Sequence, residues 1–195
     1  MSNFNASHHI KLPELEAAFE HLTSAPADNA KIEQIVFRED YGERDFRQSI
    51  EVTRAYGIIG ERWTKAPWSK LPDGSADPRI QVAILSPRLR DLVWRDRENT
   101  VHPGDTLTAD LDFSEKNLPA GQLLQAGTAV LRVTDLWNES CAKFKMRYGR
   151  VAYDFIRRPE HRSLRLRGLL CAVEQDGTIE VGNHCLLYTS DAADE

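Results

Sequence analysis

Cysteine is scarce in this 195-residue chain, which contains three, and long apolar runs are absent. No stretch approaches the roughly 18 to 20 apolar residues of a membrane-spanning helix. The amino-terminal segment MSNFNASHHIKLPELEAAFEHL lacks the basic region and apolar core of a signal peptide. These absences predict a cytoplasmic protein with no membrane partner and with reduced cysteines. A basic excess is also absent, since the net charge is −5, so nucleic acid is not an expected partner.

Motifs for common cofactors and catalytic groups are missing as well. The segment GIIGERW lacks the lysine and the spacing of a phosphate-binding loop. The six histidines are scattered without zinc-ligand spacing, and no G-x-S-x-G elbow marks a serine nucleophile. No motif indicates a flavin, a haem or an iron–sulfur cluster, so a redox activity would need electrons from another protein.

Short strands separated by turns dominate the predicted elements. Strands are expected over residues 31–38, 46–52, 80–86, 105–113 and 128–136, with a hairpin over 165–183 that turns at Asp176-Gly177. Helices are expected over residues 13–22, 87–94, 141–148 and 151–157, the last two separated at Gly149. Because the pattern shows neither βαβ alternation nor a repeat, the predicted fold is mainly β with short helices (α+β). The architecture would be a closed or nearly closed mixed β-barrel with helices over one end.

The final segment, CLLYTSDAADE, fits nothing before it. It resembles the translation of a transposase-type sequencing adaptor, and the codons available for His184 and Glu195 agree with that reading frame. We therefore interpret residues 185–195 as a translated adaptor artefact, with the native C-terminus truncated, and expect them to make no contacts. Cys141 and Cys171 are then the native cysteines.

Cys141 lies in the stretch WNESCAKFKMRYG, residues 137–149. With Asn138 or Ser140 as the N-cap, the cysteine would occupy the first turn of a helix, where the positive end of the helix dipole favours a thiolate. Lys143, Lys145 and Arg147 would favour it further. The alternative is a small, half-buried residue that merely starts a helix. Cys171, inside the apolar run LLCAV, is expected to pack in the core with its thiol protonated.

Arginine is concentrated in RRPEHRSLRLRG, residues 157–168. Arg165 and Arg167 are expected to share one face of a strand that enters the hairpin, and the guanidinium fork suits phosphate. The alternative is a solvated face of helix and loop.

Four blocks then suggest a family: GERW, DTLTADLDFSEKNLPAGQLLQAGTAVLRVT, NESCAKF and RLRGLLCAVEQDGTIEVG. Their order resembles the MOSC domain family, which is similar to the C-terminal domain of molybdenum cofactor sulfurase and includes small stand-alone bacterial proteins. The resemblance runs from about Lys31 to Gly182. It departs from the family at Gly60-Glu61, where Gly-Asp is more usual, and at Asn183, where Asp is usual. The predicted organisation is an N-terminal helix and linker over residues 1–30 and a MOSC domain over 31–184.

The resemblance implies a MOSC-type mixed β-barrel in which Cys141 ligates the molybdenum of a pyranopterin cofactor, or carries sulfur as a persulfide. Lys143, Arg147, Arg165 and Arg167 would surround the anionic cofactor. Pyridoxal phosphate is not expected, since the chain is too short for a desulfurase domain. The leading function is a molybdenum-dependent oxidoreductase that reduces a small N-hydroxylated substrate with electrons from a redox partner protein. A persulfide sulfur carrier (a sulfur transferase) and a non-catalytic cofactor-binding or storage module are the alternatives.

Overall fold

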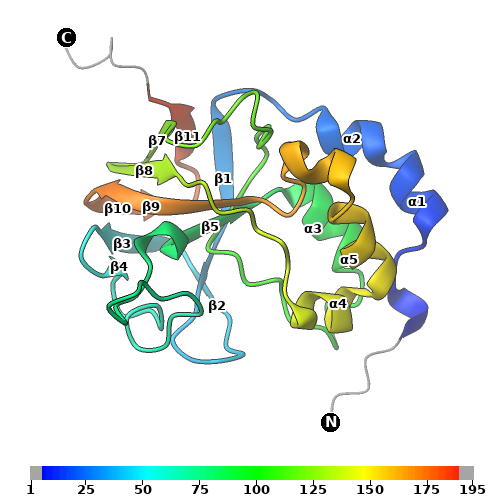
Figure 1. Cartoon of the computed structure of the whole chain (residues 1–195), viewed down its shortest axis with the longest axis horizontal. Helices are drawn as coiled ribbons and strands as arrows, with labels where there is room; N and C mark the ends of the chain where they lie inside the picture. The colour runs from blue at the N-terminus through cyan, green and yellow to red at the C-terminus, as the bar shows by residue number, and fades with distance from the viewer. Residues whose placement is uncertain (1–5, 189–195) are drawn as a thin grey trace.

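Seven strands close into a mixed β-barrel in the computed structural model, which describes residues 6–188 (Figure 1). The order around the barrel is β11-β7-β8-β9-β5-β6-β1, and β1 pairs with β11 to close it. Only β5 and β6 pair in parallel among these neighbours. The barrel strands are β1 (Ala30–Phe37), β5 (Val82–Leu85), β6 (Leu107–Ala109), β7 (Leu123–Ala126), β8 (Ala129–Val133), β9 (Leu169–Gln175) and β11 (His184–Leu187). The predicted mixed barrel is confirmed.

A second, three-stranded sheet overturns the predicted hairpin. It consists of β10 (Gly177–Glu180), β3 (Ser49–Thr53) and β4 (Gly57–Ile58). The expected turn at Asp176-Gly177 separates β9 from β10, but β10 pairs with β3 instead of folding back on β9. The amide of Thr178 donates to the Thr128 hydroxyl at 2.8 Å, and this bond to the β7–β8 turn helps to direct the chain out of the barrel. A further strand, β2 (Asp45–Arg47), lies on the outer edge of β1.

In residues 6–188, five short helices gather beside the barrel (Figure 1). They are α1 (Leu12–Ala17), α2 (Phe19–Thr23), α3 (Pro87–Val93), α4 (Ala142–Tyr148) and α5 (Arg150–Ile156), with 3-10 turns η1 (Ala6–His8), η2 (Pro78–Ile80) and η3 (Pro159–Leu164). The helix expected over residues 13–22 breaks at Ala18, whereas the expected break at Gly149 is confirmed. Within residues 6–188, no helix has the length and apolarity needed to cross a bilayer.

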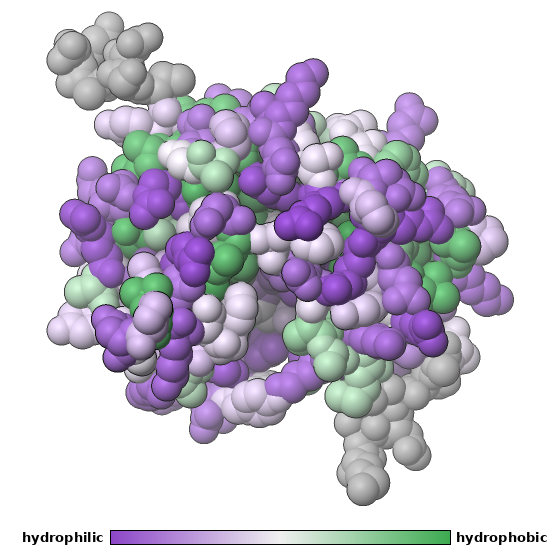
Figure 2. Space-filling model, viewed as in Figure 1, coloured by the Kyte–Doolittle hydropathy of each residue, from purple (hydrophilic) through white to green (hydrophobic). Residues whose placement is uncertain are grey.

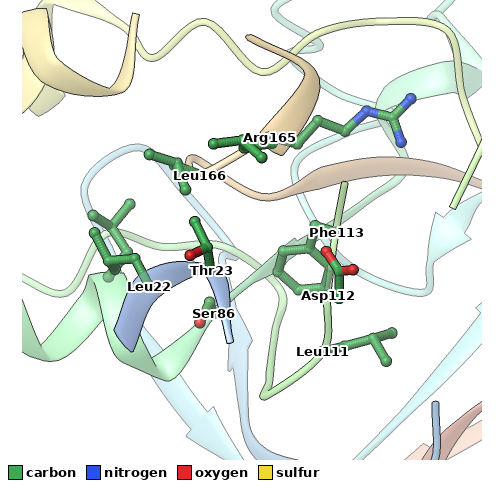
Figure 3. A pocket seen from close by; sticks show the side chains of 10 residues that line it. Leu22, Thr23, Ser86, Leu111, Asp112, Phe113, Arg165 and Leu166 are labelled. Atoms are coloured by element: carbon green, nitrogen blue, oxygen red, sulfur yellow. The ribbon is translucent and has the colours of Figure 1, made fainter. Parts of the chain in front are cut away.

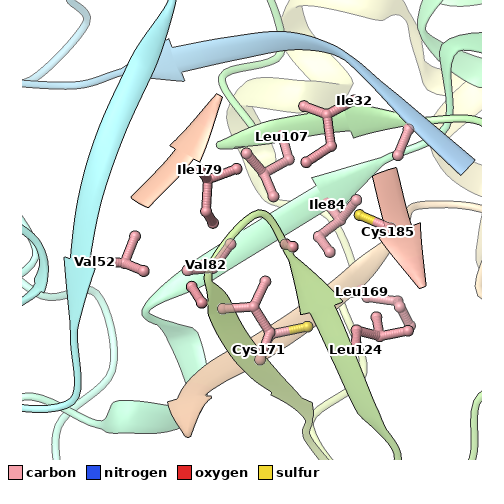
Figure 4. Close-up of a cluster of buried hydrophobic side chains, with 14 of the residues drawn as sticks. Ile32, Val52, Val82, Ile84, Leu107, Leu124, Leu169, Cys171, Ile179 and Cys185 are labelled. Carbon is pink, nitrogen blue, oxygen red and sulfur yellow. The ribbon is translucent and has the colours of Figure 1, made fainter. Parts of the chain in front are cut away.

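The barrel interior is filled by alternating apolar side chains from its strands, and both cysteines of this region point into it (Figure 4). Cys171 is fully buried, as its apolar sequence context predicts, and burial raises the pKa of its thiol. A second apolar cluster joins the helices to one another, with Leu15, Leu89 and Phe155 among its buried members. The helices therefore have a core of their own next to the barrel core.

Strand β11 corrects the expectation that residues 185–195 make no contacts. Cys185 is fully buried, pairs with Ala30 of β1 and Ala126 of β7, and has its thiol pKa raised to about 12 by burial. The boundary between residues 184 and 185 falls inside this strand. The adaptor origin of the segment stays a prediction, and residues 189–195 lie outside the described part of the chain.

Two substitutions on β11 test its place in the barrel. Cys185→Asp would put a carboxylate into the core and should lower the free energy of unfolding by more than about 3 kcal/mol, or prevent folding. Leu186→Asp is the matched control, because this side chain is 37% exposed on the same strand, and it should cost less than about 1 kcal/mol. Thermal unfolding followed by circular dichroism measures both. Equal melting temperatures for the two variants would show that β11 does not close the barrel in solution.

Candidate functional site

Cys141 is itself the N-cap residue of α4, and its side chain is exposed. The expectation that Asn138 or Ser140 caps this helix is therefore wrong. The Cys141 side chain accepts no capping hydrogen bond, so its sulfur is left free of that role. Because α4 has only seven residues, its dipole is short, and nearby side-chain charges should govern the electrostatics of the thiol.

The loop before Cys141 is held by Arg157. Arg157 donates to the Glu139 carbonyl at 2.9 Å and to its carboxylate at 3.1 Å. Ser140 adopts a left-handed conformation with φ of 68°, which a non-glycine residue takes up only where its surroundings enforce it. The Ser140 hydroxyl is buried without a hydrogen-bond partner in residues 6–188. This strained residue turns the chain so that the thiol lies at the surface and not in the helix core.

Lys143 and Arg147 are one helical turn apart and so share a face of α4. The Lys143 ammonium lies 3.4 Å from the centroid of the Tyr41 ring, which comes from the loop between β1 and β2. The Arg62 guanidinium lies 5.3 Å from the same ring. Burial and the neighbouring Arg147 lower the pKa of Lys143. Tyr41 thus brings a cation of the barrel loops close to the cations of α4.

Arg44 adds a half-buried cation to this group. Its Nε donates to the His102 carbonyl at 3.2 Å. Burial, followed by repulsion from Arg38 and Arg147, lowers the pKa of Arg44 to about 10. Gly104, at φ of 86°, permits this position, since a Cβ there would collide with the Arg44 guanidinium. The guanidinium stays charged at neutral pH although its surroundings disfavour that charge.

These cations share one further property. Most arginines of the chain are paired with a carboxylate, but in residues 6–188 no ion pair involves Arg44, Arg62, Lys143 or Arg147. Figure 2 shows a hollow beside α4, between the helices and the barrel, with hydrophilic side chains along much of its rim. A cluster of unpaired positive side chains raises the local concentration of anions. We call these four residues the cation cluster.

Arg167 lies against α4 and is fixed by a buried ion pair. Its guanidinium donates to Asp105 at 2.7 Å, where the two side chains are 11% and 3% exposed. The guanidinium is also 5.1 Å from the ring of Phe144. The second oxygen of Asp105 and the Nε of Arg167 have no partner in residues 6–188. Arg167 therefore packs against α4 through Phe144, and the Arg167–Asp105 pair leaves one nitrogen and one oxygen free to form further hydrogen bonds.

The segment before Asp105 is tied to the same helix. Tyr148 of α4 donates its hydroxyl to the Val101 carbonyl at 2.6 Å, and burial raises the pKa of this phenol. The amide of Gly104 donates to Nδ1 of His102 at 3.0 Å, so the ring proton lies on Nε2. Burial lowers the pKa of His102 to about 4, which leaves the imidazole neutral at pH 7. Hydrogen bonds thus tie residues 101–105 to Tyr148 of α4 and to Arg44 of the loop between β1 and β2, and we call this segment the wall.

Glu61, which stands where the MOSC family that the sequence resembles more usually has Asp, also has a structural partner. Its fully buried carboxylate accepts two hydrogen bonds from Arg38, at 2.7 and 2.9 Å. Arg38 in turn lies 3.5 Å from the Thr106 hydroxyl, next to Asp105. Such a bidentate pair holds the glycine turn against the barrel rim. The longer carboxylate is therefore accommodated without an unpaired charge.

Arg165 does not join the other predicted site residues. Strand β9 starts only at Leu169, so Arg165 and Arg167 share no strand face. Arg165 is left-handed, with φ of 48°, and its buried guanidinium donates to the Leu118 carbonyl and lies 3.9 Å from Glu115. Figure 3 shows the guanidinium turned away from the apolar side chains of a small pocket that Arg165 lines. Burial lowers the pKa of this arginine, whose observed partners give it a structural role.

Lys145 also points elsewhere, because its ammonium lies 5.5 Å from the Tyr153 ring of α5. The structure thus groups Cys141, Lys143, Arg147 and Arg167 around α4 and leaves Arg165 and Lys145 outside. Sequence reasoning missed Tyr41, Arg44, Arg62, His102 and Asp105. Gly104-Asp105, at the start of a strand-like segment, could have indicated the role of residues 101–105. No sequence pattern could have indicated Arg44 and Arg62, because only tertiary folding brings their loops to α4.

Comparison with solved structures finds this fold in other proteins. The YuaD protein from Bacillus subtilis matches with a TM-score of 0.56 and 18% identity, over 83% of this chain and 97% of that chain. YiiM from Escherichia coli matches with a TM-score of 0.54 and 15% identity, over 82% and 70%. YiiM from Geobacillus stearothermophilus matches with a TM-score of 0.52 and 15% identity, over 84% and 77%.

Sequence comparison finds no match. No protein-family model matches the chain, and no curated protein matches it. At identities of 15 to 18%, the likeness shows the fold alone. That fold is a mixed β-barrel with short helices, as the predicted MOSC type requires.

Proposed function

We propose that this chain is a MOSC-family protein that binds a molybdenum–pyranopterin cofactor in the hollow beside α4, with Cys141 as the protein ligand of the metal. The proposed activity is the reduction of small N-hydroxylated compounds. The observation that carries the proposal is the cation cluster: four positive side chains without an ion pair in residues 6–188 gather beside α4, the helix that begins at the exposed Cys141. Electrostatic repulsion among these positive charges destabilises the unliganded protein, and a bound anion would offset that repulsion.

The chemistry of the residues fits this cofactor. A thiolate is a soft ligand suited to a soft metal centre, and arginine and lysine suit the phosphate of a pterin cofactor. In residues 6–188, no three His, Cys, Asp or Glu side chains gather as a metal site. Cys141 would therefore be a single protein ligand, and the pyranopterin would bring the remaining sulfur ligands with it.

When bound, the cofactor supplies the redox centre at which an N–O bond can be reduced. The net reaction converts R–NH–OH, two electrons and two protons into R–NH2 and water, and the electrons come from a reduced protein carrier. Cys141 would hold the metal at the surface, where a substrate could reach it. The cation cluster orients the anionic cofactor, and the wall of residues 101–105 keeps α4 fixed while the substrate binds.

The exposure of Cys141 also favours the second candidate, a persulfide carrier. A sulfur atom carried at the surface is accessible to an acceptor, and the other two thiols are buried in the barrel core, which leaves Cys141 alone at the surface. A non-catalytic module that binds or stores the cofactor is the third candidate. These functions differ in metal content and in turnover.

The metal content of protein from a cofactor-competent host tests the leading proposal. We expect close to one molybdenum per chain by mass spectrometry and turnover of an N-hydroxylated compound with a reduced viologen dye. Cys141→Ser removes the soft ligand and should reduce both to background, with little change in melting temperature because the residue is exposed. Cyanide-releasable sulfur without metal would identify the persulfide carrier instead, and metal without turnover would identify the storage module.

The three thiols should differ sharply in reactivity. Cys141 is exposed, whereas Cys171 and Cys185 are buried and have raised pKa values, so mild alkylation of the native protein should label Cys141 alone. Peptide mapping by mass spectrometry identifies the labelled site, and Cys141→Ser is the control that should abolish the fast phase. Rapid labelling of Cys185 would contradict the structure, in which this thiol is not part of a free tail.

The cation cluster should determine how firmly the cofactor is held. Arg147→Gln removes one unpaired cation and should lower the molybdenum-to-protein ratio after gel filtration severalfold. Lys145→Gln is the matched control, two residues away on the same helix, and should have no effect, since its side chain points to Tyr153. Arg167→Ala is a poorer test, because it would strand the buried Asp105 charge and destabilise the fold by about 3 to 5 kcal/mol. Equal retention in the two Gln variants would refute the role of Arg147.

A further inference from the structure

The outer sides of α4 and α5 form an exposed surface next to Cys141. Met146 of α4 is 53% exposed and Val151 of α5 is 39% exposed, while Lys145 and Arg150 are exposed beside them. We call these four residues the α4–α5 surface. Figure 2 shows pale-green, apolar side chains gathered over α4 beside the hollow. Methionine and arginine are enriched where proteins bind one another, so an apolar centre with a basic rim is typical of an interface.

Charge is distributed unevenly between this part of the chain and the rest. Residues 137–167 contain nine Lys and Arg against three Asp and Glu, whereas the remaining residues contain 16 Lys and Arg against 27 Asp and Glu. The segment that carries Cys141, α4, α5 and η3 is therefore strongly positive within a chain of net charge −5. A positive surface on a negative molecule orients an approaching acidic protein toward that surface.

The basic side chains here are available to a partner. In residues 6–188, Lys145 forms no ion pair, and its ammonium lies over the Tyr153 ring. The ion pair between Arg150 and Asp154 spans 3.1 Å with side chains 77% and 54% exposed, and such a pair contributes little and exchanges easily. Arg157 lies 4.9 Å from the Tyr153 ring and 5.9 Å from the Trp137 ring. Arg157 is itself paired with Glu139, so it extends the surface toward the loop that precedes Cys141 without being a free charge.

We propose that the α4–α5 surface docks an acidic electron-carrier protein, which delivers electrons to the site at Cys141. The inference rests on the proposed function, because only a reductase needs such a donor. Electron transfer weakens steeply with distance, so a donor must bind beside the metal ligand, and this surface adjoins it along the same helix. Complexes between redox proteins have small interfaces and are short-lived. A surface with two exposed apolar residues and a basic rim is of that size.

The test uses the molybdenum-loaded full chain with two electron donors. The first is an acidic flavodoxin, kept reduced electrochemically at low ionic strength, and the second is a reduced viologen dye, which needs no docking surface. Lys145→Glu/Arg150→Glu reverses two charges on the α4–α5 surface. Arg54→Glu/Lys116→Glu is the matched control, because both side chains are exposed and the change in net charge is the same. Arg54 lies between β3 and β4, at the opposite side of the molecule from α4 and α5 (Figure 1).

We expect the first double variant to lower kcat/KM for flavodoxin at least about tenfold and the control to change it less than about twofold. The viologen-driven rate should be equal in all three proteins. An equal loss in both double variants, no loss in the first, or viologen-driven turnover without any flavodoxin-driven turnover would overturn the docking proposal. Absence of viologen-driven turnover in the unaltered protein would instead overturn the proposed function, so the two failures are distinguishable.

Discussion

A β-barrel depends on every strand having a neighbour on both sides, because an open edge leaves a row of backbone amides and carbonyls unpaired. In this chain the last barrel position is filled by β11, which pairs with β1 on one side and β7 on the other. Without it, the ends of β1 and β7 would face solvent, and the apolar interior around Leu124 and Cys171 would be open. The closed barrel provides the rigid rim on which the functional loops are mounted.

The rim is joined to the helices by residues 101–105. Tyr148 donates to this segment, and Asp105 accepts from Arg167, whose guanidinium also lies over Phe144 of α4. A buried ion pair adds little net stability, but it holds its partners in one arrangement when every neighbour is in place. Here that arrangement fixes the helix that begins at Cys141. The four cations of the cluster come together from three separate parts of the chain: the loop between β1 and β2, the segment after β4, and α4.

The arginines in and around the candidate site fall into two groups that differ in their partners. Arg38, Arg165 and Arg167 are engaged by Glu61, Leu118 and Asp105. Arg44, Arg62 and Arg147 are not engaged by any carboxylate in residues 6–188, and they belong to the cation cluster. The same residue type therefore pairs with a carboxylate or a buried carbonyl in the first group, whereas the arginines of the cation cluster have no carboxylate partner in residues 6–188. Composition alone could not separate the two groups, which explains why Arg165 was grouped with Arg167 from the sequence.

The sequence by itself determined the class of fold, most of the strand and helix positions, the break at Gly149 and the burial of Cys171, because these follow from local periodicity, glycine geometry and apolar context. Tertiary structure decided the rest. The partner of β10, the place of Cys185 in the core and the direction of Arg165 depend on segments far away in sequence, since strand partners and side-chain acceptors are chosen by three-dimensional proximity. The cation cluster is the clearest case: Arg44 and Arg62 come from barrel loops and Lys143 and Arg147 from α4, and only the closed barrel brings these charges together.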